Sequence, residues 1–149
     1  MSHENVEIVR RYIASVDALR GQVDDPVGLA ALELPEFSSH MEEYWHPEVV
    51  FDVSGRPDGG IYRGRDGVIQ ATRDWLQAWE EYEMEFKQVI PGVDPVVLVQ
   101  IDVRGRPRGG PKVEVRDLYI ALTVRDGQFV RYKEYVTRAM AVEAAGISE

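Results

Sequence analysis

Apolar side chains at helical spacing mark the first segment of the chain. They recur every three or four positions, at Val6, Val9, Ile13 and Val16. This spacing places them on one face of an α-helix. With Ser2 available as a cap for its N-terminus, the pattern predicts a helix over about residues 3–19.

Residues 20–36 interrupt this pattern and are longer than most connections in compact domains, which run to about 4–6 residues. Glycine and proline recur through the segment, and the apolar run Leu-Ala-Ala-Leu occupies residues 29–32. We therefore expect a loop that contains a helical turn and that packs its apolar side chains over an opening in the fold.

Two further helical patterns follow this segment. The first spans about residues 37–45 and ends before His46-Pro47, because a proline disfavours helix at the residue before it. The second begins near Asp66, a suitable cap. Its apolar side chains gather on one side, at Val68, Ile69, Trp75, Leu76 and Trp79.

The rest of the chain alternates between apolar and polar residues, which is the pattern of β-strands. Strands are predicted at about residues 48–54, 82–90, 95–104, 112–124 and 128–137, with a short one at 61–64. One apolar phase of the strand at 95–104 should face the core, with Val97, Val99, Ile101 and Val103. A tight turn at 125–127 joins the last two strands into a hairpin.

Most strands follow the helices along the chain, which indicates an α+β fold with a mostly antiparallel sheet. Three helices in the N-terminal half are too few to cover both faces of so long a sheet, so the second face must be curled, solvated or paired with another subunit. Val96 and Leu98 are apolar and lie in the phase opposite to the expected core residues. We therefore predict that the second face pairs with another copy of the chain in a homodimer.

Composition narrows the class of protein. The 149 residues suit one domain, 1–149, that buries a sizeable core. A net charge of -9, from 17 basic and 26 acidic side chains, argues against nucleic acid as a partner, since phosphate binding needs a basic surface. The basic residues gathered at 104–112 are typical of a solvated hairpin tip.

The sequence also lacks the marks of several common sites. It has no cysteine, and His3, His40 and His46 do not have the spacing of metal ligands. No phosphate loop, nucleophile elbow or dinucleotide fingerprint is present, so we expect no metal and no cofactor. The N-terminus does not resemble a signal peptide, and no run approaches the roughly 18 apolar residues of a membrane span. We expect a soluble, cytoplasmic protein without a membrane partner.

Several longer stretches resemble a known family. VRRYIASVDA, YRGRDGVIQATRDW and VRDGQFVRYKEYVTRAMAVEAAG are similar to segments of the SnoaL-like branch of the nuclear-transport-factor-2-like superfamily, which includes ketosteroid isomerases and polyketide cyclases. The resemblance covers nearly the whole chain except residues 20–36. It implies a cone of curved, mostly antiparallel sheet that, with the three helices, encloses a pocket.

The resemblance to ketosteroid isomerases also suggests site residues. Tyr12 falls at the position of their oxyanion-hole tyrosine, and Asp52 falls one residue from their general base. Asp52 reaches the pocket only if Val50 shares its inward phase; if Phe51 points inward, Asp52 points out. Their second oxyanion-hole acid would fall nearest Ile120, so steroid isomerisation is not expected.

The last strand offers the leading candidate, Glu134. One phase carries Val130, Tyr132, Glu134 and Val136, and the other carries Phe129, Arg131, Lys133 and Tyr135. Turning the first phase inward places Glu134 in the pocket beside Tyr132. Limonene-epoxide hydrolases of this superfamily have an aspartate at the matching place, but their other catalytic groups have no counterparts in this sequence, so epoxide hydrolysis is not expected.

These residues define candidate roles and their alternatives. Glu134 in an apolar pocket could act as general acid or base, or it could only form an ion pair, for which Arg116 is the preferred partner. Tyr12 could donate a hydrogen bond to a developing oxyanion, or its ring could simply pack in the core. Asp52 is the reserve base. The expected ligand-binding residues are Trp45, Phe51, Trp75, Trp79, Met84, Phe86, Arg116, Leu118 and Tyr132.

Two functions are consistent with this pattern. The first is a cofactor-free acid–base enzyme of isomerase, cyclase, hydratase or hydrolase type that acts on a small apolar molecule. The second is a non-catalytic module of the same fold that binds a small molecule or assembles as a dimer. A cavity of roughly 300 Å³ or more that reaches Glu134 would favour the first.

Overall fold

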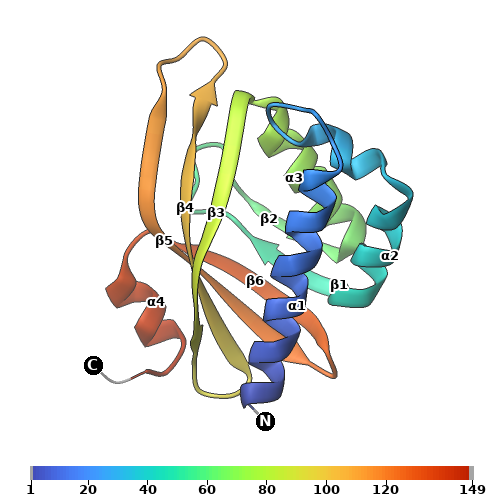
Figure 1. Ribbon diagram of the computed structural model, residues 1–149. Coiled ribbons are helices and arrows are strands. Elements are labelled where there is room, and N and C mark those ends of the chain that lie inside the picture. Colours follow the sequence, from blue (N-terminus) through green and yellow to red (C-terminus); the bar gives the residue numbers. More distant parts are fainter. Residues whose placement is uncertain (1, 148–149) are drawn as a thin grey trace.

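The computed structural model describes residues 2–147, which form one curved, unclosed sheet with helices on both of its faces (Figure 1). The six strands lie in the order β2-β1-β6-β5-β4-β3. Their bounds are β1 (Trp45–Asp52), β2 (Ile61–Arg63), β3 (Trp79–Pro91), β4 (Val96–Pro107), β5 (Val113–Arg125) and β6 (Gln128–Tyr135). Only β1 and β6 pair in parallel, so the predicted α+β class with a mostly antiparallel sheet is confirmed.

Three helices from the N-terminal half lie on the concave side of the sheet, as Figure 1 shows. They are α1 (Ser2–Gly21), α2 (Pro35–Tyr44) and α3 (Gly64–Gln77), and a 3-10 turn, Leu29–Glu33, precedes α2. The turn confirms the helical segment expected within residues 20–36. Trp79 does not belong to the third helix as expected, because α3 ends at Gln77 and Trp79 begins β3.

A short C-terminal helix, α4 (Arg138–Ala144), covers part of the opposite face of the sheet. The sequence pattern predicted only a tail there, because seven residues are too few for a helical repeat to stand out. Its N-terminus is capped by Thr137, whose hydroxyl accepts a hydrogen bond of 3.2 Å from the backbone N–H of Met140.

The main core lies between the concave face and α1–α3. The predicted inward phase of β4 is confirmed, since its side chains are all buried there: Val97, Val99, Ile101 and Val103. Met84 and Phe86, which occupy alternate positions of β3, pack against the same core. Part of this core stays open as the cavity described below.

The apolar phase at Val96 and Leu98 has a different explanation from the one expected. Leu98 is fully buried in a second cluster, together with Tyr119 of β5 and Ala141 of α4, and Val96 packs against it. Because α4 of the same chain covers this face, the two residues give no support to a dimer face. The homodimer stays a prediction that light scattering can test.

None of the helices within residues 2–147 combines the length and the apolar character that crossing a bilayer requires.

Candidate functional site

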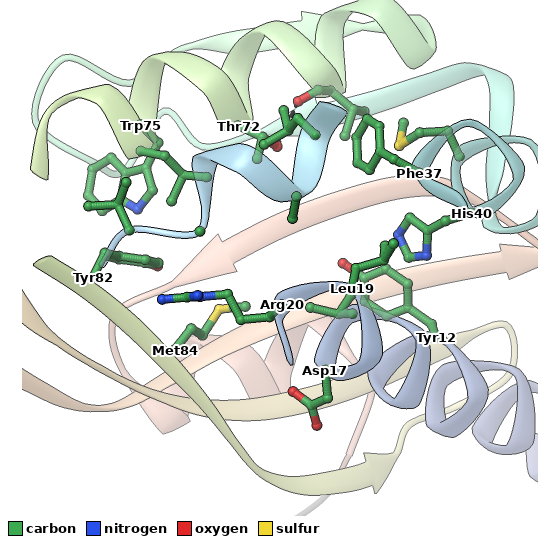
Figure 2. Close-up of a pocket in the computed structure, with 18 of the residues that line it drawn as sticks. Tyr12, Asp17, Leu19, Arg20, Phe37, His40, Thr72, Trp75, Tyr82 and Met84 are labelled. Carbon is green, nitrogen blue, oxygen red and sulfur yellow. Dashed lines mark hydrogen bonds between the residues drawn. The ribbon is translucent and has the colours of Figure 1, made fainter. Parts of the chain in front are cut away.

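A cavity of about 230 Å³ lies between the concave face of the sheet, the helices α1, α2 and α3, and the 20–36 segment. Figure 2 shows side chains from these elements converging on it. Most of its wall is apolar or aromatic, with Phe37, Trp45, Phe51, Trp75 and Met84 among the larger side chains. The cavity is smaller than the threshold expected for a catalytic pocket, and Glu134 is not part of its wall.

The 20–36 segment forms one side of the cavity, as the sequence predicted. Val27, Ala31 and Leu32 line the space. The fold of the segment depends on Asp25, whose carboxylate accepts hydrogen bonds from the backbone N–H groups of Val27 (2.9 Å) and Ala30 (2.8 Å). The bond from Val27 is the largest of the effects that lower the pKa of Asp25. The segment therefore has a defined fold over the cavity.

Two contacts fasten this segment to the rest of the protein. The backbone N–H of Tyr82 donates to the carbonyl oxygen of Pro26 at 2.9 Å, which joins the segment to β3 at the edge of the sheet. Glu33 lies 3.6 Å from Arg73 of α3, in an exposed ion pair that contributes little. The covering segment is thus held chiefly by its apolar contacts and by the bond to β3.

The main polar feature of the cavity wall is Arg56, which forms an ion pair with Glu134 behind it. The Nε of Arg56 donates to Oε1 of Glu134 at 2.7 Å, and its Nη2 donates to Oε2. The hydroxyl of Tyr132 donates to the same Oε2 at 3.0 Å. Only 17% of the Arg56 side chain and 16% of the Glu134 side chain are exposed. Arg56 and Tyr132 line the cavity, and Glu134 holds Arg56 from behind.

This pair corrects the expected partner of Glu134. Arg116 is exposed and bonds to Glu114 at 2.7 Å, so it neither pairs with Glu134 nor lines the cavity. No local pattern points to Arg56, because this residue belongs to the turn between β1 and β2 and meets β6 through the parallel pairing of β1 with β6.

The turn that carries Arg56 folds tightly against β1. The backbone N–H of Arg56 donates to the carbonyl of Val53 at 3.0 Å, and that of Gly59 donates to the carbonyl of Arg56 at 2.9 Å. A Cβ at Gly59 would lie 1.9 Å from the oxygen of Val53, so only glycine fits there. This close approach fixes the backbone from which Arg56 reaches the cavity.

Electrostatics keep Arg56 charged. Burial by itself works to lower the pKa of Arg56, but the hydrogen bonds and charge of Glu134 raise it above its ordinary value. Burial, followed by the charge of Glu134, raises the pKa of Tyr132 well above its usual range, so Tyr132 remains a hydrogen-bond donor. The guanidinium of Arg56 also lies over the Trp75 ring, 4.2 Å from its centroid.

Trp75 and Tyr82 complete this end of the cavity. Their rings are 6.1 Å apart and perpendicular. Burial raises the pKa of the Tyr82 hydroxyl, and the neighbouring Trp75 partly opposes this. The Trp75 indole N–H is buried and makes no hydrogen bond of normal geometry to any residue that the structure describes.

Tyr12 and His40 form the opposite wall. Tyr12 lines the cavity as the resemblance implied, and its ring stacks on His40 with centroids 5.5 Å apart. Nδ1 of His40 lies 2.7 Å from the hydroxyl oxygen of Ser15. Burial lowers the pKa of His40 to about 4 against an opposing effect of Glu43, so the ring is neutral near pH 7. Burial also raises the pKa of Tyr12.

His40 escaped the sequence analysis because its role depends on contacts between two helices. The three histidines were considered only for metal-ligand spacing, which they lack. The helical positions of Tyr12, Ser15 and His40 could have shown that α1 and α2 present polar atoms to one another, but only if the packing of those helices had been known.

Asp52 lies on the opposite face of the sheet from the cavity. Phe51 points inward and stacks on Tyr132, with ring centroids 4.2 Å apart. Asp52 is 7% exposed and accepts hydrogen bonds from the backbone N–H (3.0 Å) and the hydroxyl (2.6 Å) of Ser54, with Nζ of Lys133 at 3.8 Å. Burial works to raise its pKa, but these bonds and charges lower it overall. Asp52 therefore holds the neighbouring Ser54 and Lys133 in place, and it has no access to the cavity.

The other expected wall residues divide into two groups. Trp45, Phe51, Trp75, Met84 and Tyr132 line the cavity. Trp79, Phe86 and Leu118 pack in the surrounding core instead. The inward phase of β6 begins at Phe129 and not at Val130 as expected, because the pairing of β5 with β6 shifts register between Thr123 and Val124.

Comparison with known proteins agrees with this architecture. A family model described as a SnoaL-like domain matches residues 35–132. Among curated proteins there is no match.

Several solved structures share the fold. Bal32a from a soil-derived mobile gene cassette has a TM-score of 0.67 at 16% identity, covering 90% of this chain and 89% of that one. TerC, co-crystallized with polyporic acid, has a TM-score of 0.60 at 18% identity, covering 95% and 96%. A phenazine biosynthesis-related protein from Pseudomonas aeruginosa has a TM-score of 0.56 at 16% identity, covering 99% and 92%. At these identities the likeness concerns the fold alone.

Proposed function

The chain belongs to the SnoaL-like domain family, and from this premise we propose that its cavity binds a small, largely apolar molecule that presents an oxygen atom to Arg56. The observation that carries this proposal is the position of Arg56, an ion-paired guanidinium in the wall of a mainly apolar cavity. One structure of the same fold was co-crystallized with polyporic acid, so ligand binding is a known use of this architecture.

The size of the cavity limits the size of the ligand. A dry apolar cavity of about 150 Å³ takes up benzene. The cavity of about 230 Å³ therefore suits a molecule of one ring or two fused rings. Its aromatic wall favours a flat ligand, since offset and edge-to-face contacts between rings add to the gain from burial.

Arg56 can provide the specific polar contact. A guanidinium has five N–H donors, and two of those of Arg56 are used by Glu134, which leaves three. Because the charge of Arg56 is balanced by Glu134, its free donors favour a neutral acceptor such as a carbonyl or hydroxyl oxygen. A buried N–H group without an acceptor costs free energy, so a ligand oxygen that accepts from Arg56 should increase the affinity.

A second candidate function is cofactor-free acid–base catalysis of the isomerase, cyclase or hydrolase type on the same ligand. Tyr12 in the cavity wall favours it, because a tyrosine hydroxyl can stabilise a developing oxyanion. The neighbouring His40 is neutral and can exchange hydrogen bonds, but with a pKa of about 4 it is a weak base near pH 7. In this function Glu134 acts as a positioning residue that orients Arg56, and it does not touch the ligand.

The binding proposal is tested by titrating the protein with 2-naphthol and with naphthalene while following tryptophan fluorescence. Trp45 and Trp75 line the cavity, so a bound ring should change their emission. We expect 2-naphthol to bind about tenfold more tightly than naphthalene, the gain of one hydrogen bond to a charged group. Arg56→Met should remove this preference.

A matched double variant keeps the test valid if Arg56→Met destabilises the protein. Arg56→Met combined with Glu134→Gln removes both charges and leaves no unpaired carboxylate. Arg125→Met, at the exposed β5–β6 turn, is the control and should behave as the wild type. Absence of saturable binding by both probes, or an unchanged preference in the double variant, would overturn the proposal.

A further inference from the structure

Arg20 stands between the cavity and a second, open depression of the surface. The depression measures about 710 Å³ and is lined by residues of β3, β4 and β5 together with Arg20 and Pro26; we call it the β3–β5 groove. Arg20, Tyr82 and Glu83 belong to the walls of both the cavity and the groove. These three residues therefore mark the place where the cavity meets solvent.

The other cations of the groove are already paired with acids. Arg104 bonds to Glu83 at 2.7 Å and to Glu85 at 3.1 Å, and Lys112 lies 4.0 Å from Glu81. The guanidinium of Arg20 makes no hydrogen bond or ion pair with any residue between 2 and 147. This guanidinium is the one cation of the groove that a ligand could still balance, within the part of the chain that the structure describes.

Two acids lie near Arg20, but neither is bonded to it. The pKa of Asp25 is lowered chiefly by its backbone hydrogen bonds and also by the charge of Arg20. Its carboxylate oxygens, however, are occupied by the backbone N–H groups of Val27 and Ala30. Asp17 lies one helical turn before Arg20 and also lines the cavity. These two carboxylates partly offset the positive charge of Arg20, but they do not occupy its hydrogen-bond donors.

The side chain of Arg20 is held in place by the 20–36 segment. Gly28 passes so close that a Cβ there would lie 2.7 Å from both Cδ and Nε of Arg20, and its φ of 80° suits glycine. Figure 2 shows Arg20 reaching from the end of α1 toward Tyr82 and Met84. Its stem is thus fixed under the segment, and its guanidinium is directed to the mouth.

From this geometry we infer that the ligand is an organic acid, whose carboxylate or similar anionic group binds Arg20 at the mouth while its ring fills the cavity. This inference rests on the proposed function and names the ligand class of the same site. The two arginines then have different roles. Arg56, balanced by Glu134, binds a neutral oxygen, and Arg20, without a bonded acid, binds a charged one in the planar, bidentate manner typical of guanidinium groups.

The test compares naphthalene-2-carboxylate with the neutral naphthalene-2-carboxamide, which has nearly the same shape. We expect the carboxylate to bind the wild type at least about tenfold more tightly, with a dissociation constant that rises with salt because the contact is partly exposed. Arg20→Gln should weaken the carboxylate about tenfold and leave the carboxamide within about twofold. Arg20→Lys should keep part of the preference that Arg20→Gln loses, since lysine retains the positive charge but lacks the planar, paired donors of a guanidinium.

A control variant separates local from overall charge. Arg125→Gln changes the net charge by the same amount at an exposed turn, and it should leave both affinities unchanged. Equal binding of the two naphthalene compounds by the wild type, or equal weakening of both by Arg20→Gln, would overturn the inference while 2-naphthol binding still supports the proposed function. If neither these compounds nor 2-naphthol bind, the proposed function fails and the inference fails with it.

Discussion

Arg56 and Arg20 present two different electrostatic environments to one small cavity. Arg56 is held by both oxygens of Glu134 and by its position over Trp75, so its direction is set before a ligand arrives. Arg20 is fixed along its stem by Gly28, but its charged end bonds to none of the residues from 2 to 147. A binding site for an aromatic molecule with a polar end needs both properties: Arg56 is already oriented, and Arg20 has donors that a ligand can use.

The first prediction concerns the carboxylate behind Arg56. Glu134→Gln keeps the shape of the side chain but leaves the charge of Arg56 unbalanced in a site where only 17% of that side chain is exposed. We expect the free energy of unfolding to fall by about 2–3 kcal/mol, somewhat less than for a fully buried pair. Urea denaturation measures this, and the affinity for 2-naphthol should fall in parallel because Arg56 is no longer oriented.

Glu114→Gln is the matched control for this change. Glu114 pairs with Arg116 on the surface, where 40% of the Glu114 side chain and 69% of the Arg116 side chain are exposed, so its loss should change stability by no more than about 0.5 kcal/mol. A Glu134→Gln protein as stable as the control would show that Arg56 does not depend on its partner.

Among the elements, the 20–36 segment is the one whose stability bears most directly on the site. It contributes the wall at Val27, Ala31 and Leu32, and its fold depends on a few backbone hydrogen bonds. Local opening of such a segment needs much less free energy than global unfolding. It is therefore the natural part of the structure to move when a ligand enters the cavity.

The second prediction tests the hydrogen bonds that define this segment. Asp25→Ala removes the acceptor of the backbone N–H groups of Val27 and Ala30, as the loss of a helix cap does, at a cost of about 1–2 kcal/mol. We expect amide hydrogens of residues 27–34 to exchange at least about tenfold faster, while those of β4 and β5 keep their rates. Hydrogen exchange followed by mass spectrometry gives both values.

The neighbouring Asp24→Ala serves as the control, because Asp24 is exposed. If Asp25→Ala and Asp24→Ala exchanged alike, the segment would owe its fold to apolar packing alone. If exchange rose throughout the sheet, Asp25 would support the whole fold and not one element.

At the scale of the whole molecule, the sequence predicted what depends on periodicity and missed what depends on contacts between distant elements. The inward phase at Val97 and Val99 was readable because alternation is a local property. The partner of Glu134 was not, because Arg56 meets β6 only through the parallel pairing of β1 with β6. A register shift in the last hairpin likewise reversed the phase at Phe129.

The same limit applies to α4. Leu98 was assigned to an interface between chains because nothing in a seven-residue segment showed that it would fold back as a helix. The resemblance to a family predicted the architecture and the position of Tyr12 in the wall. It did not supply His40, Arg20 or Arg56, which belong to this chain's own arrangement of the site.

The last prediction concerns the stability of the whole protein in acid. The pKa of His40 is about 4 in the folded protein, against an ordinary value of 6.5. Tyr12 and Ser15 of α1 and Glu43 and Tyr44 of α2 are the polar groups around it, and of the charged ones only Glu43 opposes the lowering of the pKa. Between pH 6.5 and 4 the unfolded chain therefore binds a proton at this site that the folded chain does not.

Because the unfolded state binds more protons in this window, the free energy of unfolding falls as the pH drops through it and levels off below pH 4 as far as His40 is concerned. The loss attributable to His40 should be about 1–3 kcal/mol. His40→Asn keeps an amide near the Ser15 hydroxyl but has no group that titrates at this position. Between pH 6.5 and 4 the variant should therefore lose about 1–3 kcal/mol less of its free energy of unfolding than the wild type does, whatever its stability at neutral pH. His3→Asn, at an exposed position of α1, should keep the wild-type slope. Urea denaturation of the three proteins at several pH values measures the slopes, and equal slopes for wild type and His40→Asn would show that His40 is not held neutral by its burial against Tyr12.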